Sequence, residues 1–595
     1  MSEIRTHDYD VVVIGAGGAG LRAAIEASAQ KAKVTLVCKS LLGKAHTVMA
    51  EGGAAAALGN VFSEDNWRVH FRDTMRGGKM HNNWRMAQIH AQEAPDRIKE
   101  LEAWGALFDR TPDGRINQRP FGGHTYSRLA HVGDRTGLEM IRVLQDRGVH
   151  SGIEVHMECT IVRLFVVGGR MAGALGYFRE TGRFVLFRAG AIILATGGIG
   201  KAWQITSNSW EYTGDGHALA YEAGAELIDM EFVQFHPTGM VWPPSVRGIL
   251  VTEGVRGEGG VLKNNKGERF MFRYMPEMYK GDFADTEAEA DAWVKGERKK
   301  NRRPPELLTR DVVAKAIKKE VEEGRGTEHG GVFLDIASKQ SPDYIKKKLP
   351  SMYHQFKELA HVDITKDAME IGPTTHYVMG GVKVDAETQE STVPGLYAAG
   401  EVGGGMHGAN RLGGNSLSDL LVFGRRAGQH AAAKRGAAPK IPDAEIEAAM
   451  RDALGAFERE GENPYAVQSA LQKVMQRHAS IIRDKGGLET ALAELEKLKA
   501  RARKVGVTGS REYNPGWHTS IDLRSLLVVS EASARAALER TESRGAHTRS
   551  DYPDSDPKQE REQIAIKKEG DRMVVRRESQ PPLPDDLMTL IKEGK

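Results

Sequence analysis

The fold is decided by Val11-Val12-Val13-Ile14-Gly15-Ala16-Gly17-Gly18-Ala19-Gly20. The four β-branched residues at its start predict a buried parallel strand, because such side chains suit a sheet that is covered on both faces. Residues 21–27 are mostly good helix formers and include no helix breaker. Gly15 permits a tight turn, Gly17 lets a pyrophosphate approach the backbone, and Gly20 lets helix and strand pack closely. Strand, turn and helix together predict a dinucleotide site at a helix N-terminus.

The next strand lacks the residue that usually binds the ribose. This strand is predicted at residues 33–37, at the distance that a nucleotide-binding unit requires. An acidic residue normally ends it and binds the adenosine ribose. This chain has Cys38-Lys39-Ser40 there instead. The difference argues against an ordinary NAD site and leaves the ribose contact unassigned.

Two further apolar strands, at residues 191–198 and 395–401, also end in glycine turns. Strands of this form that lie far apart along a chain indicate one sheet interrupted by an inserted domain. We predict an α/β fold: a Rossmann-like nucleotide-binding domain interrupted by an α+β capping domain, then a helical bundle and a small C-terminal module. The expected boundaries are 1–235 and 371–428 for the two parts of the first domain, 236–370 for the capping domain, 429–542 for the helical domain and 543–595 for the C-terminal module.

Composition and charge restrict the class of protein. The 595 residues include 83 Lys and Arg against 80 Asp and Glu, a balance that predicts no nucleic-acid partner. The two cysteines, Cys38 and Cys159, fit a reducing compartment and argue against an iron–sulfur cluster in this chain, since such clusters usually need four thiolates. No apolar run approaches the ~20 residues of a membrane span, and no export signal is visible. We expect a soluble, intracellular protein that can still dock on a membrane component.

The candidate site residues are polar side chains beside glycines or at the ends of apolar segments, where a cavity is expected. Arg310 begins a predicted helix, where its charge opposes the helix macrodipole, so another task is expected for it. Taken singly, each candidate fits a structural role as well as a functional one. The candidates are His46, His236, Thr252, Glu253, Arg256, Arg310, His376 and Arg411.

Five strings in the second half of the chain occur together in one known family. They are His236-Pro237-Thr238-Gly239, Thr252-Glu253-Gly254, Arg310-Asp311-Val312-Val313, Thr375-His376-Tyr377-Val378-Met379-Gly380-Gly381 and His407-Gly408-Ala409-Asn410-Arg411-Leu412-Gly413-Gly414-Asn415-Ser416-Leu417. With these strings in this order, the chain resembles the flavoprotein subunit of succinate dehydrogenase and fumarate reductase (complex II). The resemblance covers nearly the whole chain, including the helical region and residues 543–553 of the tail.

The resemblance implies that the first domain binds FAD. It places the cofactor on the glycine turn and links it covalently to His46, which Thr47 follows. Such a link makes the flavin easier to reduce, which suits a weak reductant such as succinate. Relatives that oxidise aspartate with free FAD lack a histidine at this position. The further FAD contacts that the resemblance implies are Lys39, Ser40, Gly52, Gly53, Asp215, Glu401, Ser416 and Leu417.

The resemblance also implies that succinate and fumarate are the substrates. Two buried carboxylates need compensating donors, and by analogy His236, Thr252, His376 and Arg411 bind them. The proton that moves at the substrate is assigned to Arg310, with Glu253 and Arg256 as the relay to solvent. Because the pKa of arginine exceeds about 12, we expect Arg310 to share the proton within a hydrogen-bonded relay. No metal ion is expected among these residues.

Electrons need a further acceptor, because neither a cluster nor a membrane span is expected in this chain. The resemblance implies an iron–sulfur subunit, which in turn connects to membrane anchor subunits, with the chain peripheral on the cytoplasmic face of the cell membrane. One alternative is a soluble flavoenzyme of the same superfamily, an aspartate oxidase or a free fumarate reductase. Another is a flavin-binding protein without redox turnover.

Overall fold

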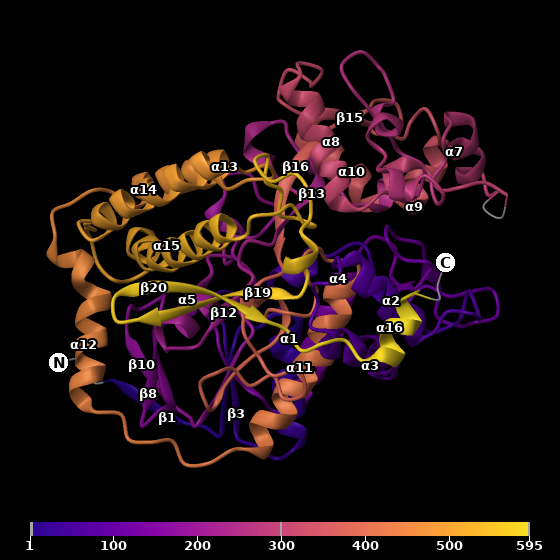
Figure 1. Ribbon diagram of the computed structural model, residues 1–595. Helices are drawn as coiled ribbons and strands as arrows, with labels where there is room; N and C mark the ends of the chain where they lie inside the picture. Colours follow the sequence, from indigo (N-terminus) through magenta and orange to yellow (C-terminus); the bar gives the residue numbers. More distant parts are fainter. Residues whose placement is uncertain (1–3, 298–299, 593–595) are drawn as a thin grey trace.

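A five-stranded parallel sheet forms the centre of the first domain in the computed structural model, which describes residues 4–297 and 300–592 (Figure 1). Its order is β18 (Leu396–Ala398), β11 (Ala191–Leu194), β2 (Val11–Ile14), β3 (Val34–Val37) and β7 (Glu154–His156). All neighbouring pairs run parallel. The prediction of one α/β sheet assembled from distant apolar strands is therefore confirmed.

The two faces of this sheet bury alternate side chains of β2. Val11 and Val13 pack among helices α1 (Gly18–Ala29), α3 (Trp84–Ala103), α4 (Thr136–His150) and α11 (Asn415–Ala433). Val12 and Ile14 pack against a second sheet. That sheet has the order β1 (Arg5–Asp8), β10 (Phe184–Arg188), β9 (Arg170–Phe178) and β8 (Cys159–Val167). Burial on both faces explains why β2 consists only of β-branched residues.

Helices α1 and α11 lie backbone against backbone. A Cβ atom on Gly424 would meet Ala19 O at 2.6 Å, and one on Gly428 would meet Ala23 O at 2.2 Å. The two glycines are one helical turn apart, so they line the same side of α11. This close approach brings the N-termini of both helices to the same side of the central sheet.

The capping domain is held by two long strands, β13 (Val233–Met240) and β16 (Met369–Val378), which pair antiparallel. The expected boundaries after residues 235 and 370 fall inside these strands. Its sheet continues through β15 (Val332–Asp335) to β14 (Val261–Lys263). Its helices are α6 (Gly254–Gly257), α7 (Glu287–Val294), α8 (Arg310–Glu322), α9 (Pro342–Lys348) and α10 (Pro350–Ala360). Helix α7 lies in a charged stretch without sequence periodicity and buries Ala290 and Trp293.

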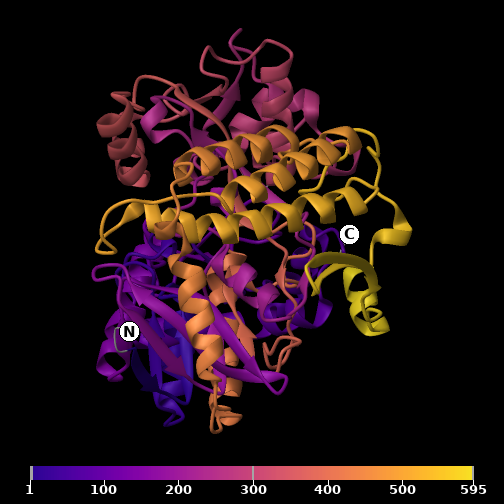
Figure 2. The same cartoon turned by 90° about the vertical axis from the view of Figure 1, so that its left-hand side faces the viewer.

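The helical domain lies along the first domain. Helices α13 (Pro464–His478), α14 (Lys485–Ala502) and α15 (Pro515–Glu539) pack against one another, as Figure 2 shows. Helix α12 (Asp443–Leu454) contacts β8 and meets the start of α15, where Trp517 Nε1 donates to Ala453 O at 2.8 Å. Within the described residues, no helix is both long and apolar enough to cross a membrane.

The C-terminal residues are joined to the first domain. Strands β19 (Glu562–Glu569) and β20 (Arg572–Ser579) form a hairpin that extends a sheet with β17 (Gly381–Val382) and β12 (Leu227–Ile228). Helix α16 (Asp585–Lys592) packs on α2 (Trp67–Gly77).

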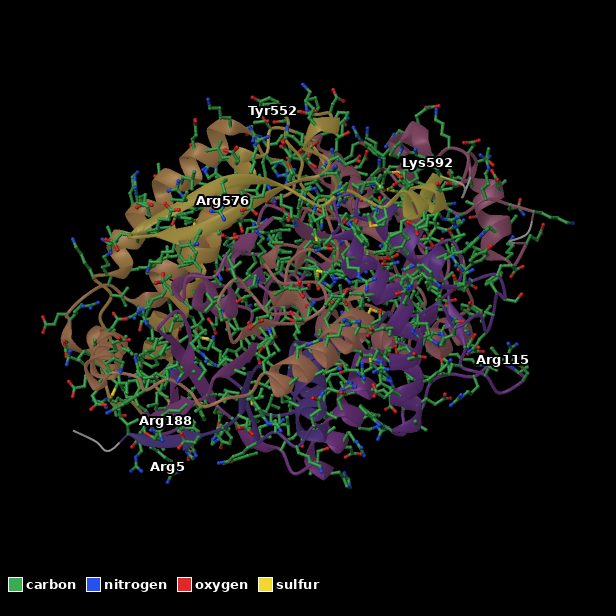
Figure 3. The ribbon with its side chains drawn as sticks, turned by 60° about the horizontal axis from the view of Figure 1, so that its bottom comes forward. Arg5, Arg115, Arg188, Tyr552, Arg576 and Lys592 are labelled. Carbon is green, nitrogen blue, oxygen red and sulfur yellow. The ribbon has the colours of Figure 1, made fainter. Side chains whose placement is uncertain are left out.

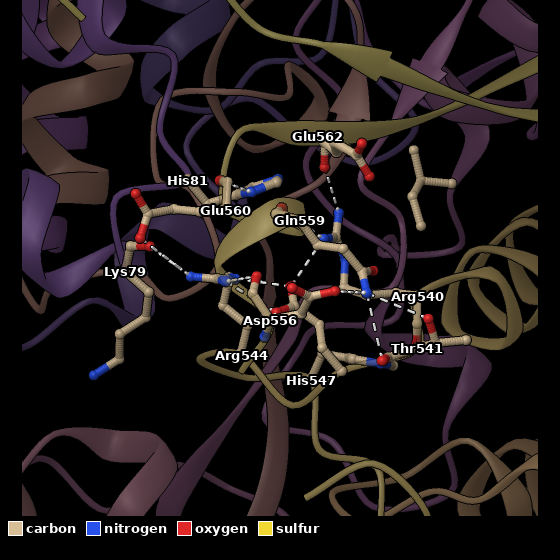
Figure 4. A network of polar contacts seen from close by, with 12 residues as sticks. Lys79, His81, Arg540, Thr541, Arg544, His547, Asp556, Gln559, Glu560 and Glu562 are labelled. Carbon is tan, nitrogen blue, oxygen red and sulfur yellow. Dashed lines mark hydrogen bonds and ion pairs between the residues drawn. The ribbon is translucent and has the colours of Figure 1, made fainter. Parts of the chain in front are cut away.

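A buried ionic network fixes the chain between α15 and β19 (Figure 4). Arg540 Nε lies 2.6 Å from Glu231 Oε1, and Arg544 Nε lies 2.8 Å from Glu542 Oε1. Arg544 Nη1 also donates to the carbonyl oxygen of Lys79 at 3.2 Å. Because breaking a buried pair leaves an uncompensated charge, these contacts hold the helical domain and the tail against the first domain.

Candidate active site

One cavity at the carboxyl ends of β2, β3, β11 and β18 reaches to the capping domain. Such an edge is where open α/β sheets bind ligands. The predicted residues that line it are Gly15, Ala16, Gly17, Gly18, Ala19, Lys39, Ser40, His46, Thr47, Gly52, Gly53, Asp215, His236, Thr252, Glu253, Arg310, His376, Glu401, Arg411, Ser416 and Leu417. Gly20 and Arg256 lie behind its wall. A Cβ atom on Gly20 would meet Gly15 O at 1.8 Å, which agrees with a packing role.

Two helix N-termini open into this cavity without a side-chain cap. The N-cap residues are Gly17 for α1 and Gly414 for α11, and neither supplies a capping side chain. The Gly18 N–H of α1 donates to Thr47 Oγ1 and the Asn415 N–H of α11 donates to Leu412 O, both at 3.3 Å. The partial positive charge of the two helix ends still favours an anion such as a pyrophosphate. Gly15 has a φ of +114°, and a Cβ atom there would overlap Ala195 O at 2.1 Å. The turn fits a dinucleotide whose phosphates approach the backbone.

Lys39 occupies the position where an acidic ribose ligand is usual. Its Nζ lies 2.9 Å from Asp215 Oδ2 and 2.6 Å from Asp522 Oδ1. Burial disfavours the ammonium, but the two carboxylates outweigh this and raise the pKa of Lys39. Asp522 belongs to α15, so the helical domain contacts a residue that lines the cavity. Asp522 was not predicted from the sequence, because nothing local connects α15 with the nucleotide unit.

His46 lies in the middle of the cavity, in a short 3-10 helix, His46–Met49. The backbone N–H of Ser209 donates to its Nδ1 at 3.4 Å, and the ring of Tyr212 lies 4.6 Å away, edge to face. Burial lowers the pKa of His46 to about 4. The imidazole is therefore neutral near pH 7 and keeps a lone pair on its ring.

His236 and His376 face each other across the β13–β16 pair. Their ring centroids are 5.1 Å apart. His236 Nδ1 lies 3.0 Å from Thr238 O, and His376 Nδ1 lies 2.9 Å from Ser207 Oγ. Burial, followed by nearby positive charge or imidazole, lowers the pKa of both well below the usual value. Both side chains are neutral near pH 7, and their Nδ1 atoms are occupied, which leaves Nε2 for a ligand.

Arg310, Glu253 and Arg256 form a buried chain of alternating charge. Arg310 Nε lies 3.0 Å from Glu253 Oε2, and Arg256 Nη2 lies 3.7 Å from the same oxygen. Burial would raise the pKa of Glu253, but Arg310 and Arg256 outweigh it, so the pKa is lowered. Arg256 Nη1 also donates to Glu306 O. The three predicted residues of the proton relay are therefore in contact.

Gln234 joins the two arginines of the cavity and was not among the predicted site residues. Its Oε1 accepts from Arg310 Nη1 and from Arg411 Nη2, both at 3.1 Å. Its Nε2 donates to Asn410 Oδ1 and to Arg411 O, both at 2.8 Å. The available signal was spacing, because residues two apart on a strand share a face and Gln234 precedes His236 by two.

The far end of the cavity carries an excess of positive charge. Arg411 packs over the ring of Tyr377 at 4.3 Å, and burial lowers its pKa to about 10, so it stays charged near pH 7. Burial raises the pKa of Glu401 to about 8, and its Oε1 accepts from the Val378 N–H at 3.1 Å. Burial also raises the pKa of Glu51 well above the usual value. Glu253 is then the ionised carboxylate facing two guanidinium groups, and the site favours an anionic ligand.

The fold and the phosphate-binding turns define an FAD-dependent oxidoreductase. A family model described as "FAD binding domain" matches residues 10–417, and one described as "Fumarate reductase flavoprotein C-term" matches residues 468–581. The chain therefore belongs to the family of flavoprotein subunits of succinate dehydrogenase and fumarate reductase.

Similarity to relatives of known name or structure extends over almost the full chain. This chain is 38% identical to the succinate dehydrogenase flavoprotein subunit of Coxiella burnetii, in an alignment that covers 93% of this chain and 94% of the relative. It is 37% identical to the fumarate reductase flavoprotein subunit of Mycobacterium tuberculosis, covering 93% of each. The solved structure of Mycobacterium smegmatis Sdh1 in complex with UQ1 aligns with a TM-score of 0.87 at 56% identity. The alignment covers 99% of this chain and 97% of that chain.

Proposed function

We propose that this chain is the flavoprotein subunit of a succinate:quinone oxidoreductase, which interconverts succinate and fumarate and passes electrons to an iron–sulfur subunit. The observation that carries the proposal is the end of the cavity beyond His46. That space is lined by the guanidinium groups of Arg310 and Arg411 and by two neutral imidazoles, those of His236 and His376. The ionised carboxylate there is Glu253. A four-carbon dicarboxylate supplies the two negative charges that this set of donors requires.

Substrate binding is assigned to four side chains. Arg411 offers its guanidinium to one carboxylate, and its orientation is set by Gln234 and by Ser416, whose Oγ accepts from Nη1 at 2.8 Å. His236 and His376 offer their Nε2 atoms, and Thr252 its hydroxyl. Because these groups come from β13, β16 and two loops, they hold the substrate between the capping domain and the first domain. The clamp orients the central carbons and excludes water.

Proton transfer is assigned to Arg310, Glu253 and Arg256. The contact of Arg310 with Glu253 lets a proton that leaves the substrate be shared along the chain toward Arg256. Glu253 stays ionised and compensates the guanidinium charges, so Arg310 need not become a free neutral base. When bound, FAD supplies the acceptor or donor of the hydride at the neighbouring substrate carbon.

Covalent attachment of FAD is assigned to His46. Its position in the cavity beside the glycine turn, its burial and its neutral imidazole support this assignment. Thr47 joins the His46 segment to the glycine turn, since its Oγ1 accepts from the Gly18 N–H at 3.3 Å. A soluble aspartate oxidase is less well supported, because that branch lacks a histidine here.

Membrane anchors and the iron–sulfur subunit are proposed as partners, with the chain on the cytoplasmic face of the membrane. The support is that the chain has two cysteines, both buried, which are too few to ligate a cluster. The relative from Coxiella burnetii is named as a subunit of succinate dehydrogenase, and the Mycobacterium smegmatis structure is a complex with UQ1.

The deciding experiment is anaerobic titration of the purified complex. We expect succinate to bleach the flavin absorption and fumarate to restore it, and acid precipitation to leave FAD with the protein pellet. Reduction by aspartate but not by succinate would refute the proposal in favour of an oxidase. A flavin spectrum that no dicarboxylate changes would favour a protein without redox turnover.

A further inference from the structure

Two histidines and a glutamate meet where the two sheets of the first domain touch. His7 lies on β1, an edge strand of the four-stranded sheet, and Glu154 and His156 lie on β7, the edge of the central sheet. None of the three lines the active-site cavity. His7 and Tyr9 are two apart, as are Glu154 and His156, so each pair can present its side chains on one face.

The potential ligand atoms are close enough for one ion. One nitrogen of each histidine and one carboxylate oxygen of Glu154 lie within 4.8 Å of one another. His156 Nε2 is 3.6 Å from Glu154 Oε1. A tetrahedral Zn²⁺ with bonds of about 2.1 Å would hold its ligand atoms roughly 3.4 Å apart. Small side-chain rotations are therefore sufficient to close the cluster around an ion.

His7 provides an independent sign of a missing ligand. Its Nε2 is buried and has no hydrogen-bond partner among the described residues. A buried polar atom without a partner costs about 1–3 kcal/mol, so such an atom calls for an explanation. The ring of His7 lies 5.1 Å from that of His156, edge to face, and no hydrogen bond joins His7 Nε2 to it. An ion between the two histidines would satisfy His7 Nε2.

The surroundings hold the two imidazole rings in place and leave the carboxylate accessible. The ring of Phe187 packs against both histidines, with centroids 6.0 Å from His7 and 5.0 Å from His156. The Glu154 side chain is 54% exposed, which gives an ion and water access.

The other nearby carboxylate is already neutralised. Asp8 forms a two-bond ion pair with Arg188 at 2.7 Å, at the same end of the molecule where Figure 3 labels Arg5 and Arg188. Glu154 is therefore the carboxylate available to the histidines. Tyr9 Oη donates to Glu154 Oε2 at 2.5 Å and lies 3.1 Å from His156 Nε2. The phenol orients Glu154, as a second-layer partner of a metal ligand does, and its contact with His156 Nε2 would be exchanged for the ion.

We propose that His7, His156 and Glu154 bind a Zn²⁺ ion, with water as the fourth ligand and Tyr9 as the residue that orients Glu154. Two imidazoles and one carboxylate with one open position are a ligand set that Zn²⁺ uses. The site lies outside the active-site cavity and ties the N-terminal strand to the edge of the central sheet. Its function is to stabilise the junction between the two sheets.

The test uses the full-length flavoprotein with its FAD, freed of any histidine tag and stripped with a chelator. Zn²⁺ is titrated by calorimetry into the wild type and into His7→Ala, His156→Ala and Glu154→Gln. We expect one site in the wild type, whose affinity falls at least 100-fold in each histidine variant and at least tenfold in Glu154→Gln. X-ray absorption of the zinc complex should show two imidazole ligands.

The matched control is His150→Ala, because His150 is exposed on the nearby end of α4. It should bind Zn²⁺ as the wild type does and show the same rise in Tm with the ion. Tyr9→Phe removes the orienting hydroxyl but no ligand, so we expect a smaller loss of affinity and an unchanged absorption spectrum. Absence of a wild-type site, or equal binding by His7→Ala and wild type, overturns the proposal. Succinate turnover of the stripped His7→Ala enzyme should equal that of the stripped wild type, which excludes misfolding.

Discussion

The side-chain oxygen of Gln234 lies 3.1 Å from Nη1 of Arg310. The same oxygen accepts from Arg411, so one neutral amide sets the separation between the guanidinium assigned to substrate binding and the one assigned to proton transfer. An uncharged acceptor achieves this without cancelling either positive charge. A carboxylate at the same place would compete with the substrate for both arginines.

Two replacements of Gln234 should therefore distinguish its effect on the alignment of Arg310 and Arg411 from an effect on their positive charge. In Gln234→Ala the two guanidiniums lose their common acceptor, and we expect kcat/KM for succinate to fall about 10- to 100-fold with FAD content unchanged. In Gln234→Glu the acceptor remains but the arginines are neutralised, so the main effect should be a higher KM. Steady-state kinetics of both variants check this. An equal rise in KM with unchanged kcat for both would contradict an aligning role.

Arg310→Gln should abolish turnover, with a loss of more than about 10³-fold in kcat, because the proton has no other carrier at the substrate. Flavin content and the spectral change on adding fumarate should be largely retained, since Arg411 and the histidines remain. Arg247→Gln, on the exposed surface of the capping domain, is the matched control and should behave as wild type. Turnover of Arg310→Gln near the wild-type rate would remove Arg310 from the mechanism.

His46→Ala should bind FAD without a covalent link. Acid precipitation should then release the flavin into the supernatant, whereas the wild-type pellet keeps it. Because the link makes the flavin easier to reduce, succinate oxidation should fall more than fumarate reduction. His150→Ala should leave the flavin in the pellet, and retention of flavin by the His46→Ala pellet would move the attachment to another residue.

Stability should fall in acid because several histidines are buried in the neutral form. Burial lowers the pKa of His46, His124 and His217 to about 4. Between pH 6.5 and 4 the unfolded chain binds protons at these positions while the native chain does not, so each can remove up to about 3 kcal/mol. Glu401, whose pKa is raised to about 8, acts in the opposite direction between pH 8 and 4.5.

His217→Gln isolates this effect, because His217 lies on α5 (Asp215–Glu222), outside the residues that line the cavity. We expect the Tm of this variant to fall less steeply than that of the wild type between pH 6.5 and 4. His150→Gln, an exposed replacement, should keep the wild-type slope. Thermal unfolding at a series of pH values measures both, and parallel curves for His217→Gln and wild type would contradict a proton-linked origin.

The parts of the site that were predictable from sequence are those marked by local backbone requirements. The glycine turn between β2 and α1 can be recognised because its φ values and close packing permit few other residues there. His236, Arg310 and Arg411 were candidates from their local sequence, and the family resemblance supplied the roles expected of them. Helix α7 was not foreseen, because its charged sequence buries Ala290 and Trp293 without a clear helical period.

The sequence by itself determined the α/β architecture, the cofactor class and the family, because strand patterning, turn chemistry and residue order are written along the chain. Only the tertiary structure decided that Gln234 bridges Arg310 and Arg411, that Asp522 of the helical domain meets Lys39, and that His7 meets His156. The physical reason is that these contacts depend on the register between β13 and β16 and on the packing of elements far apart in sequence. Local propensity carries no information about either.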